Sequence, residues 1–474
     1  MPRIVLTGGA YTAQSLLANC QRCVNLYPEA NPPDSQAPVP VTHYLTPGLR
    51  KLASPPMSGA GRALYTASNG KVYTVVGQNV YYINDGYAYT LLGSISSPPN
   101  PAYIQDNGAT AIVVDGTANG YTIDISSNAF AAIVDPDFYG GTRIDYSDLR
   151  FILNKPGTTI FYYSDTVATT FDPLDFAAKA GYPDLLQTIQ VLRREIWLLG
   201  QFTSEVFYNA GATDAIFEQL PGSFMEHGCI APYSVAKADV SIFWLGRDFQ
   251  GRCIVFEGTN YQAKRISTHA IEYEFSKYVT VSDAVAFTYQ QAGHVFYVLN
   301  FPTADKTWVY DVSIGLWHER AWIDEDGIEH RARPNCHTFG YGLNLCIDWE
   351  TGDLYAYDTE TYTDDGNPVP RIRTFPHLVD DGKRVFYQNL IADVQVGTIL
   401  DSTPPSIYLR WSDTRGASWG QRVRQSLGDT GDYLTSVQWQ RLGVARDRVF
   451  ELSWSINAKT ALNGAFIQSK TAGT

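Results

Sequence analysis

The sequence predicts an all-β protein, in which a six- or seven-bladed β-propeller lies between an extended N-terminal arm and a C-terminal β-sandwich. Three observations predict this fold class: the composition, the pairing of short apolar segments, and the spacing of those pairs. Aromatic residues make up 13% of the 474-residue chain, and 39 glycines and 25 prolines interrupt it. This mixture favours strands and tight turns over helices. Because 45% of the residues are hydrophobic, the chain can bury more than one core.

Short apolar runs rich in aromatic residues come in pairs separated by turn residues, and each pair is typical of a β-hairpin. The seven pairs are 71–76 with 80–83, 111–114 with 121–123, 151–153 with 160–163, 196–199 with 206–208, 242–245 with 253–256, 295–299 with 308–310, and 345–347 with 354–357. Their anchors, which are 40, 39, 45, 46, 53 and 50 residues apart, are Tyr73, Val113, Ile152, Trp197, Phe243, Phe296 and Cys346. Propeller repeats have about this period.

A hairpin cannot bury its apolar face alone, so a chain that repeats one must stack the copies. Radial stacking buries these faces and also hides the strand edges. The spacing therefore favours a β-propeller over residues 51–376. A run of unrelated β-sandwiches is the alternative, because their short strands also follow one another at regular intervals.

The two ends of the chain lack this repeat. Residues 1–50 show no periodicity and contain the proline-rich stretch Tyr27–Pro40, which favours extended backbone, so we expect an arm or strap there. After Pro376 shorter alternating segments follow, which predict a C-terminal β-sandwich over residues 377–474. Helical periodicity is scarce; the best candidate, residues 184–194, is equally compatible with a strand.

Charge and hydropathy exclude several classes of function. The net charge is -13 and only 18% of residues are charged, which disfavours strong nonspecific DNA binding. Basic runs are short, such as Arg193-Arg194, and are typical of solvated surface. The N-terminal residues lack a signal-peptide pattern and no stretch is apolar enough for a membrane span, so we expect neither export nor membrane insertion. Six scattered cysteines indicate folding in a reducing cytoplasm.

Motifs that carry chemistry are weak. Cys20-Gln-Arg-Cys23 has the spacing of half a zinc site or a redox pair, but no second Cys/His pair follows at a suitable distance. The eight histidines are dispersed, and between His330 and His337 only Cys336 is a further soft ligand. Nucleophile-elbow and phosphate-loop motifs are missing from the sequence. We therefore expect no enzyme and no catalytic, cofactor-binding or metal-binding residues.

Carboxylates are plentiful in the expected turns, and two of them could converge as a glycosidase acid and base. These are Asp115, Asp135, Asp137, Asp324, Glu325, Asp326, Asp364, Asp365, Asp380 and Asp381. The segment 412–419 also ends like the Asp-box turn of sialidase propellers, although Asp413 stands one position too early and the turn occurs once. A mechanical turn is the simpler interpretation, with Asp413 and Ser418 bonding turn amides while Trp411 and Trp419 pack into the sandwich.

Segments along the whole chain resemble the packaged-DNA stabilisation proteins of short-tailed bacteriophages, which are also called tail accessory, hub or nozzle proteins. The C-terminal segments 409–419 and 439–452 resemble the closing signature of that family. Asn25-Leu-Tyr-Pro, Thr46-Pro-Gly-Leu49, the hairpin 73–82 and the segment Trp308–Trp317 are similar to it too.

This resemblance implies a structural virion protein made in the cytoplasm of the host bacterium. Six copies of a propeller subunit would form a ring below the portal and its adaptor ring, close the DNA channel to retain the packaged genome, and carry tailspikes, fibres or a needle. DNA would pass without specific binding, because an acidic channel does not hold it. A propeller would offer large walls for ring contacts, and a proline-rich arm could strap a neighbour.

Two other functions stay open from the sequence alone. A glycan-binding or glycan-hydrolysing phage propeller is suggested by the partial Asp-box turn and by the many aromatics and carboxylates. A general intracellular interaction scaffold is the third hypothesis, and it predicts the blade motifs of a regulatory repeat class, which this sequence lacks.

Overall fold

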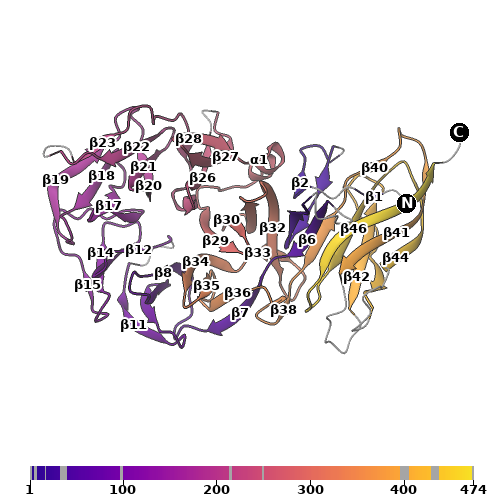
Figure 1. Ribbon diagram of the computed structural model, residues 1–474, viewed down its shortest axis with the longest axis horizontal. Coiled ribbons are helices and arrows are strands. Elements are labelled where there is room, and N and C mark those ends of the chain that lie inside the picture. Colours follow the sequence, from indigo (N-terminus) through magenta and orange to yellow (C-terminus); the bar gives the residue numbers. More distant parts are fainter. Residues whose placement is uncertain are drawn as a thin grey trace.

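The computed structural model describes residues 3–4, 8–16, 18–32, 40–96, 100–212, 216–247, 250–395, 405–428 and 437–471. These residues form two parts, which Figure 1 shows side by side: a ring of blades at the left and a sandwich of two sheets at the right. The all-β prediction is confirmed, since the described part of the chain holds a single α-helix, α1 (His269–Phe275), and a short 3-10 helix (Pro232–Ser234). None of the described helices is long and apolar enough to cross a membrane.

The propeller prediction is also confirmed, and the described residues build seven blades. The strands of blades one to four are β8 (Gly61–Thr66), β9 (Val72–Val76), β10 (Asn79–Ile83) and β11 (Tyr89–Ser94); β12 (Tyr103–Asp106), β13 (Thr110–Val114), β14 (Gly120–Asp124) and β15 (Phe130–Ala132); β16 (Ile144–Ser147), β17 (Arg150–Asn154), β18 (Ile160–Ser164) and β19 (Phe171–Ala178); and β20 (Leu186–Leu192), β21 (Glu195–Gly200), β22 (Ser204–Asn209) and β23 (Phe217–Gln219). The ambiguous segment 184–194 is therefore strand β20 and not a helix.

Blades five to seven complete the ring. Their strands are β24 (Gly228–Cys229), β25 (Ala236–Ala238), β26 (Ser241–Arg247), β27 (Cys253–Thr259) and β28 (Gln262–Arg265); β29 (Val285–Gln291), β30 (His294–Phe301), β31 (Lys306–Asp311), β32 (Leu316–Ile323) and β33 (Glu329–Arg331); and β34 (Pro334–Gly340), β35 (Leu343–Asp348), β36 (Leu354–Asp358) and β7 (Gly48–Ala53), with β37 (Thr363–Asp364) and β38 (Asn367–Pro368) beyond β7. Each of the seven predicted hairpins is the middle pair of strands in one blade.

The ring closes because the inner strands contact one another in sequence, and β34 of blade seven contacts β8 of blade one. An apolar cluster lies between each pair of neighbouring blades. Tyr73 and Val113 meet between the first two blades, and Trp197 and Trp244 meet between the fourth and fifth. A blade thus buries its faces only against its neighbours, which is the reason that the hairpins must repeat.

The C-terminal part is a sandwich, as predicted. One layer has the order β44-β41-β46-β6-β5, and the other contains β39, β45, β42 and β43. The bounds are β39 (Arg371–Thr374), β40 (Leu378–Val379), β41 (Val385–Gln395), β42 (Ser406–Ser412), β43 (Val423–Ser426), β44 (Val437–Ala445), β45 (Asp447–Trp454) and β46 (Ala461–Thr471). Leu390 and Ile467 of the first layer share a core with Leu409 and Leu452 of the second.

The N-terminal residues, expected as an arm over 1–50, contribute several strands to the chain's own sheets in the described part. They contribute β1 (Arg3–Ile4), β2 (Tyr11–Thr12), β3 (Cys20–Gln21), β4 (Cys23–Val24), β5 (Leu26–Ala30) and β6 (Val41–Leu45). β5 and β6 extend the sandwich, whereas β7 pairs with β36 and completes blade seven. Residues 33–39, the centre of the proline-rich stretch, lie outside the described part.

Closure of the ring by β7 gives a first prediction. Leu49 is 3% exposed and packs among aromatic side chains of blades six and seven, including Phe296 and Tyr355. Leu49→Ala leaves a cavity there, so we expect a loss of about 2 kcal/mol in the free energy of unfolding, measured by urea titration. Leu91→Ala is the matched control, because Leu91 is 56% exposed and should change the value by less than about 0.5 kcal/mol. Equal effects of the two substitutions would contradict the closure.

Candidate functional site: the joint between the propeller and the sandwich

The two parts of the molecule meet through the N-terminal segments 8–10 and 20–25, which we call the joint. Strand β4 lies between β32 of blade six, with which it is parallel, and β39 of the sandwich, with which it is antiparallel. One eleven-stranded sheet therefore runs from blade six into the sandwich. Such a sheet resists bending between the two parts, because any hinge would break its ladder of backbone hydrogen bonds.

Asn25 ties three segments together at the joint. Its side-chain Nδ2 donates to the carbonyl oxygens of Ala321 and Pro370, both at 2.7 Å, and its Oδ1 accepts from the backbone N–H of Ala321 at 3.1 Å. Its own carbonyl accepts from the backbone N–H of Thr46 at 3.2 Å. Asn25 has a positive φ of 52°, a conformation that asparagine tolerates better than most residues.

Arg373 fills the centre of the joint and is completely buried. Its guanidinium donates to the carbonyl oxygens of Gly8 at 2.7 Å, Gly9 at 3.4 Å and Arg22 at 3.2 Å, and to Oε1 of Gln21 at 3.0 Å. Burial lowers the pKa of Arg373 below its ordinary value. The side chain thus donates to the carbonyl groups of the N-terminal segments, and the carbonyl of Arg22 also accepts from the backbone N–H of Thr374 at 3.0 Å.

Arg22 forms ion pairs with the two outermost strands of blade six, β32 and β33. Its guanidinium lies 2.8 Å from Oε2 of Glu319 and 2.9 Å from Oε2 of Glu329. Both carboxylates thus converge on one guanidinium, and they line a pocket of about 250 Å³ together with Tyr278 and Trp308. Burial alone would raise the pKa of Glu329, but the charge of Arg22 and its hydrogen bond lower it overall. A glycosidase acid needs a raised pKa, so this pair is an ion-pair clamp.

Cys20, from the Cys20-Gln-Arg-Cys23 motif, lies 3.8 Å from Nε2 of His377, whose Nδ1 lies 2.8 Å from Asp447. The order resembles a nucleophilic triad. However, Nε2 of His377 is 2.8 Å from the carbonyl oxygen of Leu16, so this nitrogen donates its hydrogen there and is unable to take a proton from the thiol. Burial, with the charge of Asp447, raises the pKa of Cys20 to about 11. The thiol therefore stays protonated and packs as a small apolar group.

The remaining ligand candidates also serve the structure. Cys23 donates its thiol hydrogen to the carbonyl oxygen of Leu26 at 3.2 Å, and none of the six cysteines forms a disulfide bond. Among the described residues no group of three or more His, Cys, Asp or Glu side chains could hold a metal ion. Asp115, Asp135 and Asp324, three of the turn carboxylates, accept hydrogen bonds from backbone amides of their own turns.

The turn that resembles an Asp box differs from our expectation. Asp413 does not bond turn amides; it forms a two-point ion pair with Arg448, at 2.6 Å and 2.8 Å. The turn amides are held instead by Ser412, whose Oγ accepts from the backbone N–H of Gly416 at 2.8 Å. Arg448 is 2% exposed and requires a carboxylate, which explains its pairing with Asp413, whose own side chain is 47% exposed. Trp411 packs against the core, as predicted.

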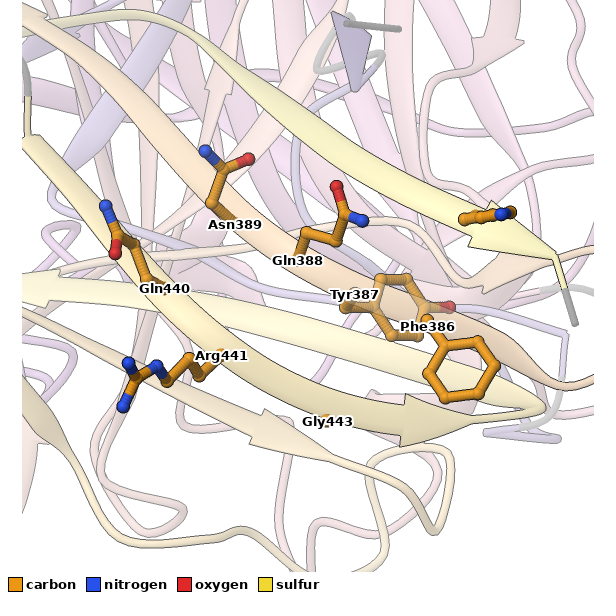
Figure 2. A pocket seen from close by; sticks show the side chains of 8 residues that line it. Phe386, Tyr387, Gln388, Asn389, Gln440, Arg441 and Gly443 are labelled. Carbon is orange, nitrogen blue, oxygen red and sulfur yellow. The ribbon is translucent and has the colours of Figure 1, made fainter.

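Figure 2 shows a shallow pocket of about 470 Å³ on the outer face of the sandwich. A β-bulge at Gln388 of β41 shifts the register against both neighbouring strands and opens the surface. Phe386 and Gln388 lie along β41 in this view, and Gln440 and Arg441 lie on β44. The eight lining residues include the cations Arg441 and Lys470 but no carboxylate, so the pocket holds no acid and base for sugar hydrolysis.

The comparisons with known proteins agree with this two-part architecture. The family model described as "Bacteriophage P22 Gp10, beta-propeller" matches residues 3–362, and the model described as "Bacteriophage P22 Gp10, beta-sandwich" matches residues 370–470. The chain belongs to this family. The resemblance noted in the sequence is thereby confirmed, and the P22 Gp10 family is one of phage structural proteins that stabilise packaged DNA. No curated protein sequence matches the chain significantly.

Solved structures with a similar fold are distant. Virginiamycin B lyase from Staphylococcus aureus has a TM-score of 0.42 and 10% identity, and the alignment covers 65% of this chain and 98% of that one. The N-terminal domain of Nup159 has a TM-score of 0.40 and 10% identity, covering 71% of this chain and 98% of that one.

Sequence reasoning located parts of this joint without assigning them a role. Asn25 stands in a segment that carries the resemblance to the P22 Gp10 family, and so does Trp317, whose carbonyl accepts from the N–H of Ala10 at 2.7 Å. Arg373 was missed. The available signal was the alternation Arg371-Ile-Arg373-Thr, in which two arginines occupy one face of a short strand directly after the propeller repeats end.

Two histidines beside the joint predict a loss of stability in acid. His43 and His318 are completely buried, and burial holds the pKa of both well below its ordinary value. The unfolded chain protonates its histidines near pH 6.5, so below that pH it binds more protons than the folded chain. The stability is therefore full above about pH 6.5 and falls as the pH decreases.

His318→Leu should remove part of this acid sensitivity. Between pH 7 and pH 5.5 we expect the variant to lose roughly 1 kcal/mol less unfolding free energy than the parent protein, measured by urea titration at each pH. His269→Leu is the control, because the His269 side chain is 80% exposed and its loss should leave the pH dependence unchanged. A His318→Leu curve parallel to that of the parent would show that this imidazole is not held neutral.

Proposed function

We propose that this chain is a ring-forming tail hub, or nozzle, of a short-tailed bacteriophage. The ring attaches below the portal and adaptor ring, closes the DNA channel so that the packaged genome is retained, and provides attachment for tailspikes, fibres or a needle. The observation that carries the proposal is that both parts of the chain, 3–362 and 370–470, match the P22 Gp10 family. The protein acts in the virion as a homo-oligomer, with six copies expected, and not as an enzyme.

The stiffness of the subunit supports this role. A continuous sheet joins blade six to the sandwich, and Arg373 and Asn25 fill its seam with hydrogen bonds. A ring that holds back packaged DNA under load needs subunits that do not bend between their parts.

The axis of the propeller does not suit the passage of DNA. The pockets along it have volumes of about 130 Å³ and 500 Å³ and are lined by side chains of the inner strands. A DNA duplex, whose major groove alone is about 12 Å wide, does not fit such spaces. The channel is therefore placed between the subunits of the ring, and the net charge of -13 is compatible with DNA that slides without being held.

Electron microscopy of purified virions tests the proposal. We expect the chain as a ring at one capsid vertex, below the portal and adaptor, and we expect phage without its gene to make filled heads that then lose DNA. The Gly9→Ala variant of the joint should fail to restore DNA retention, whereas its neighbour Gly8→Ala should restore it. Absence of the chain from virions, or full DNA retention without it, would overturn the proposal.

A further inference from the structure

A pocket of about 500 Å³ lies at one end of the propeller axis. It is bordered by residues that precede or begin the inner strands β8, β12, β29 and β34, which surround the centre of the ring in Figure 1. The polar side chains that line it include Arg62, Asp283, Arg331, Asn335 and Trp349. None of these residues belongs to the joint, and binding of a ligand here is independent of the tail-hub role.

Three residues that line this pocket each carry a buried polar atom without a hydrogen-bond partner among the described residues: Nη2 of Arg62, Nε1 of Trp349 and Oδ1 of Asp283. Arg62 is 4% exposed, and its other nitrogens are fixed by the carbonyl oxygens of Asn100, Gly77 and Ser96 at 2.7–3.0 Å. Both N–H groups of Nη2 are thus left over on an immobilised guanidinium. Buried polar groups are rarely left without partners, so a ligand or water is required here.

Arg331 places a second positive charge in the same pocket. Its guanidinium lies 4.3 Å from the ring centroid of Trp349 and 3.4 Å from Oδ1 of Asn335, and within the described part of the chain no salt bridge to it is formed. Burial lowers the pKa of Arg331 to about 10, in spite of more distant carboxylates. Two guanidiniums without a directly bonded carboxylate make the inner wall attractive to an anion.

Asp283 adds a negatively charged side chain to the same pocket. Its Oδ2 accepts from the backbone N–H of Thr303 at 2.8 Å, which fixes the carboxylate, while the buried Oδ1 has no donor among the described residues. A pure oxyanion would be repelled at this point. A ligand that satisfies every group must carry an anionic group for the arginines and the indole N–H, and a hydroxyl or ammonium donor for Asp283.

We propose that this pocket binds a small carboxylate that also carries a hydrogen-bond donor, as hydroxy acids and amino acids do. The carboxylate is held by Arg331, Nη2 of Arg62 and Nε1 of Trp349. The hydroxyl or ammonium group donates to Oδ1 of Asp283. The volume suits a ligand of this size, and the binding places a small molecule at the centre of the seven blades.

Calorimetric titration of the full chain with L-malate, L-aspartate and succinate tests this assignment, because the three share one dicarboxylate skeleton and differ in the donor. We expect saturable binding of malate and aspartate at least five-fold tighter than that of succinate. Asp283→Asn should abolish the preference for aspartate over succinate, since its amide keeps the shape and removes the negative charge.

Variants of Arg331 and Trp349, which would hold the carboxylate, complete the test. Arg331→Gln should weaken malate binding at least ten-fold, and Trp349→Phe a few-fold, since it removes only the indole donor. Arg333→Gln is the matched control, because Arg333 pairs with Asp348 and does not line the pocket. If none of the three acids gives a saturable heat, or if Arg331→Gln binds malate as well as Arg333→Gln, the pocket holds only water and the proposal is wrong.

Discussion

Arg373→Ala is expected to lower the free energy of unfolding by about 4 kcal/mol, because it removes a completely buried arginine that holds the joint by hydrogen bonds. Four acceptors each lose one hydrogen bond at once; three of them are backbone carbonyl oxygens of the N-terminal segments, of which that of Arg22 keeps its bond from the N–H of Thr374. Alanine also leaves a cavity that the stiff sheet is unable to close. Urea unfolding followed by tryptophan fluorescence measures the loss.

A control separates this effect from the mere loss of a positive charge. Arg384→Ala removes an exposed arginine from the same part of the chain and should change the unfolding free energy by less than about 0.5 kcal/mol. We also expect limited proteolysis to cut Arg373→Ala first near residues 8–22, since these lose their anchor. An Arg373→Ala protein as stable as Arg384→Ala would show that the guanidinium does not hold the joint.

The second large effect is expected at Gly9, where the N-terminal segment passes closest to blade six. A Cβ atom at this position would lie 2.2 Å from the carbonyl oxygen of Trp317, which belongs to the backbone and is unable to move aside. The same carbonyl accepts the hydrogen bond from Ala10. Gly9→Ala should therefore cost about 3 kcal/mol and release the segment from the strand.

Gly8 provides a control at the next position in the chain. A Cβ atom there meets nothing within 4 Å, so Gly8→Ala should leave the stability within about 0.5 kcal/mol of the parent. Hydrogen exchange adds a local measurement, because only Gly9→Ala should increase the exchange of the Ala10 amide. If both alanine variants behave alike, the close approach to Trp317 does not exist in solution.

The blades could be predicted because their signal is local. A strand of four to eight residues alternates or runs apolar, and its hairpin partner follows within a few residues. Tyr73 and Trp197, chosen as anchors from the sequence, are both buried at blade interfaces for this reason. The number of blades stayed open because the last blade takes its outer strand, Gly48–Ala53, from the other end of the chain.

The joint could not be predicted because its strands are too short to show a period. β3 and β4 have two residues each, and the partner of Val24 in blade six is Glu319, almost three hundred residues away. A proline-rich neighbourhood correctly indicated extended backbone. It gave no information on which sheets that backbone would join, so the segment was interpreted as an arm.

The sequence by itself determined the all-β class, the propeller with its repeated hairpins, the C-terminal sandwich and the family, since each depends on patterns within short stretches of chain. Only the tertiary structure decided that Arg373, Asn25 and Gly9 form one seam and that three residues with unpaired buried polar atoms line one pocket at the axis. The physical reason is that alternation of apolar residues is written along a strand, whereas hydrogen-bond partners in a closed ring are chosen by proximity in space.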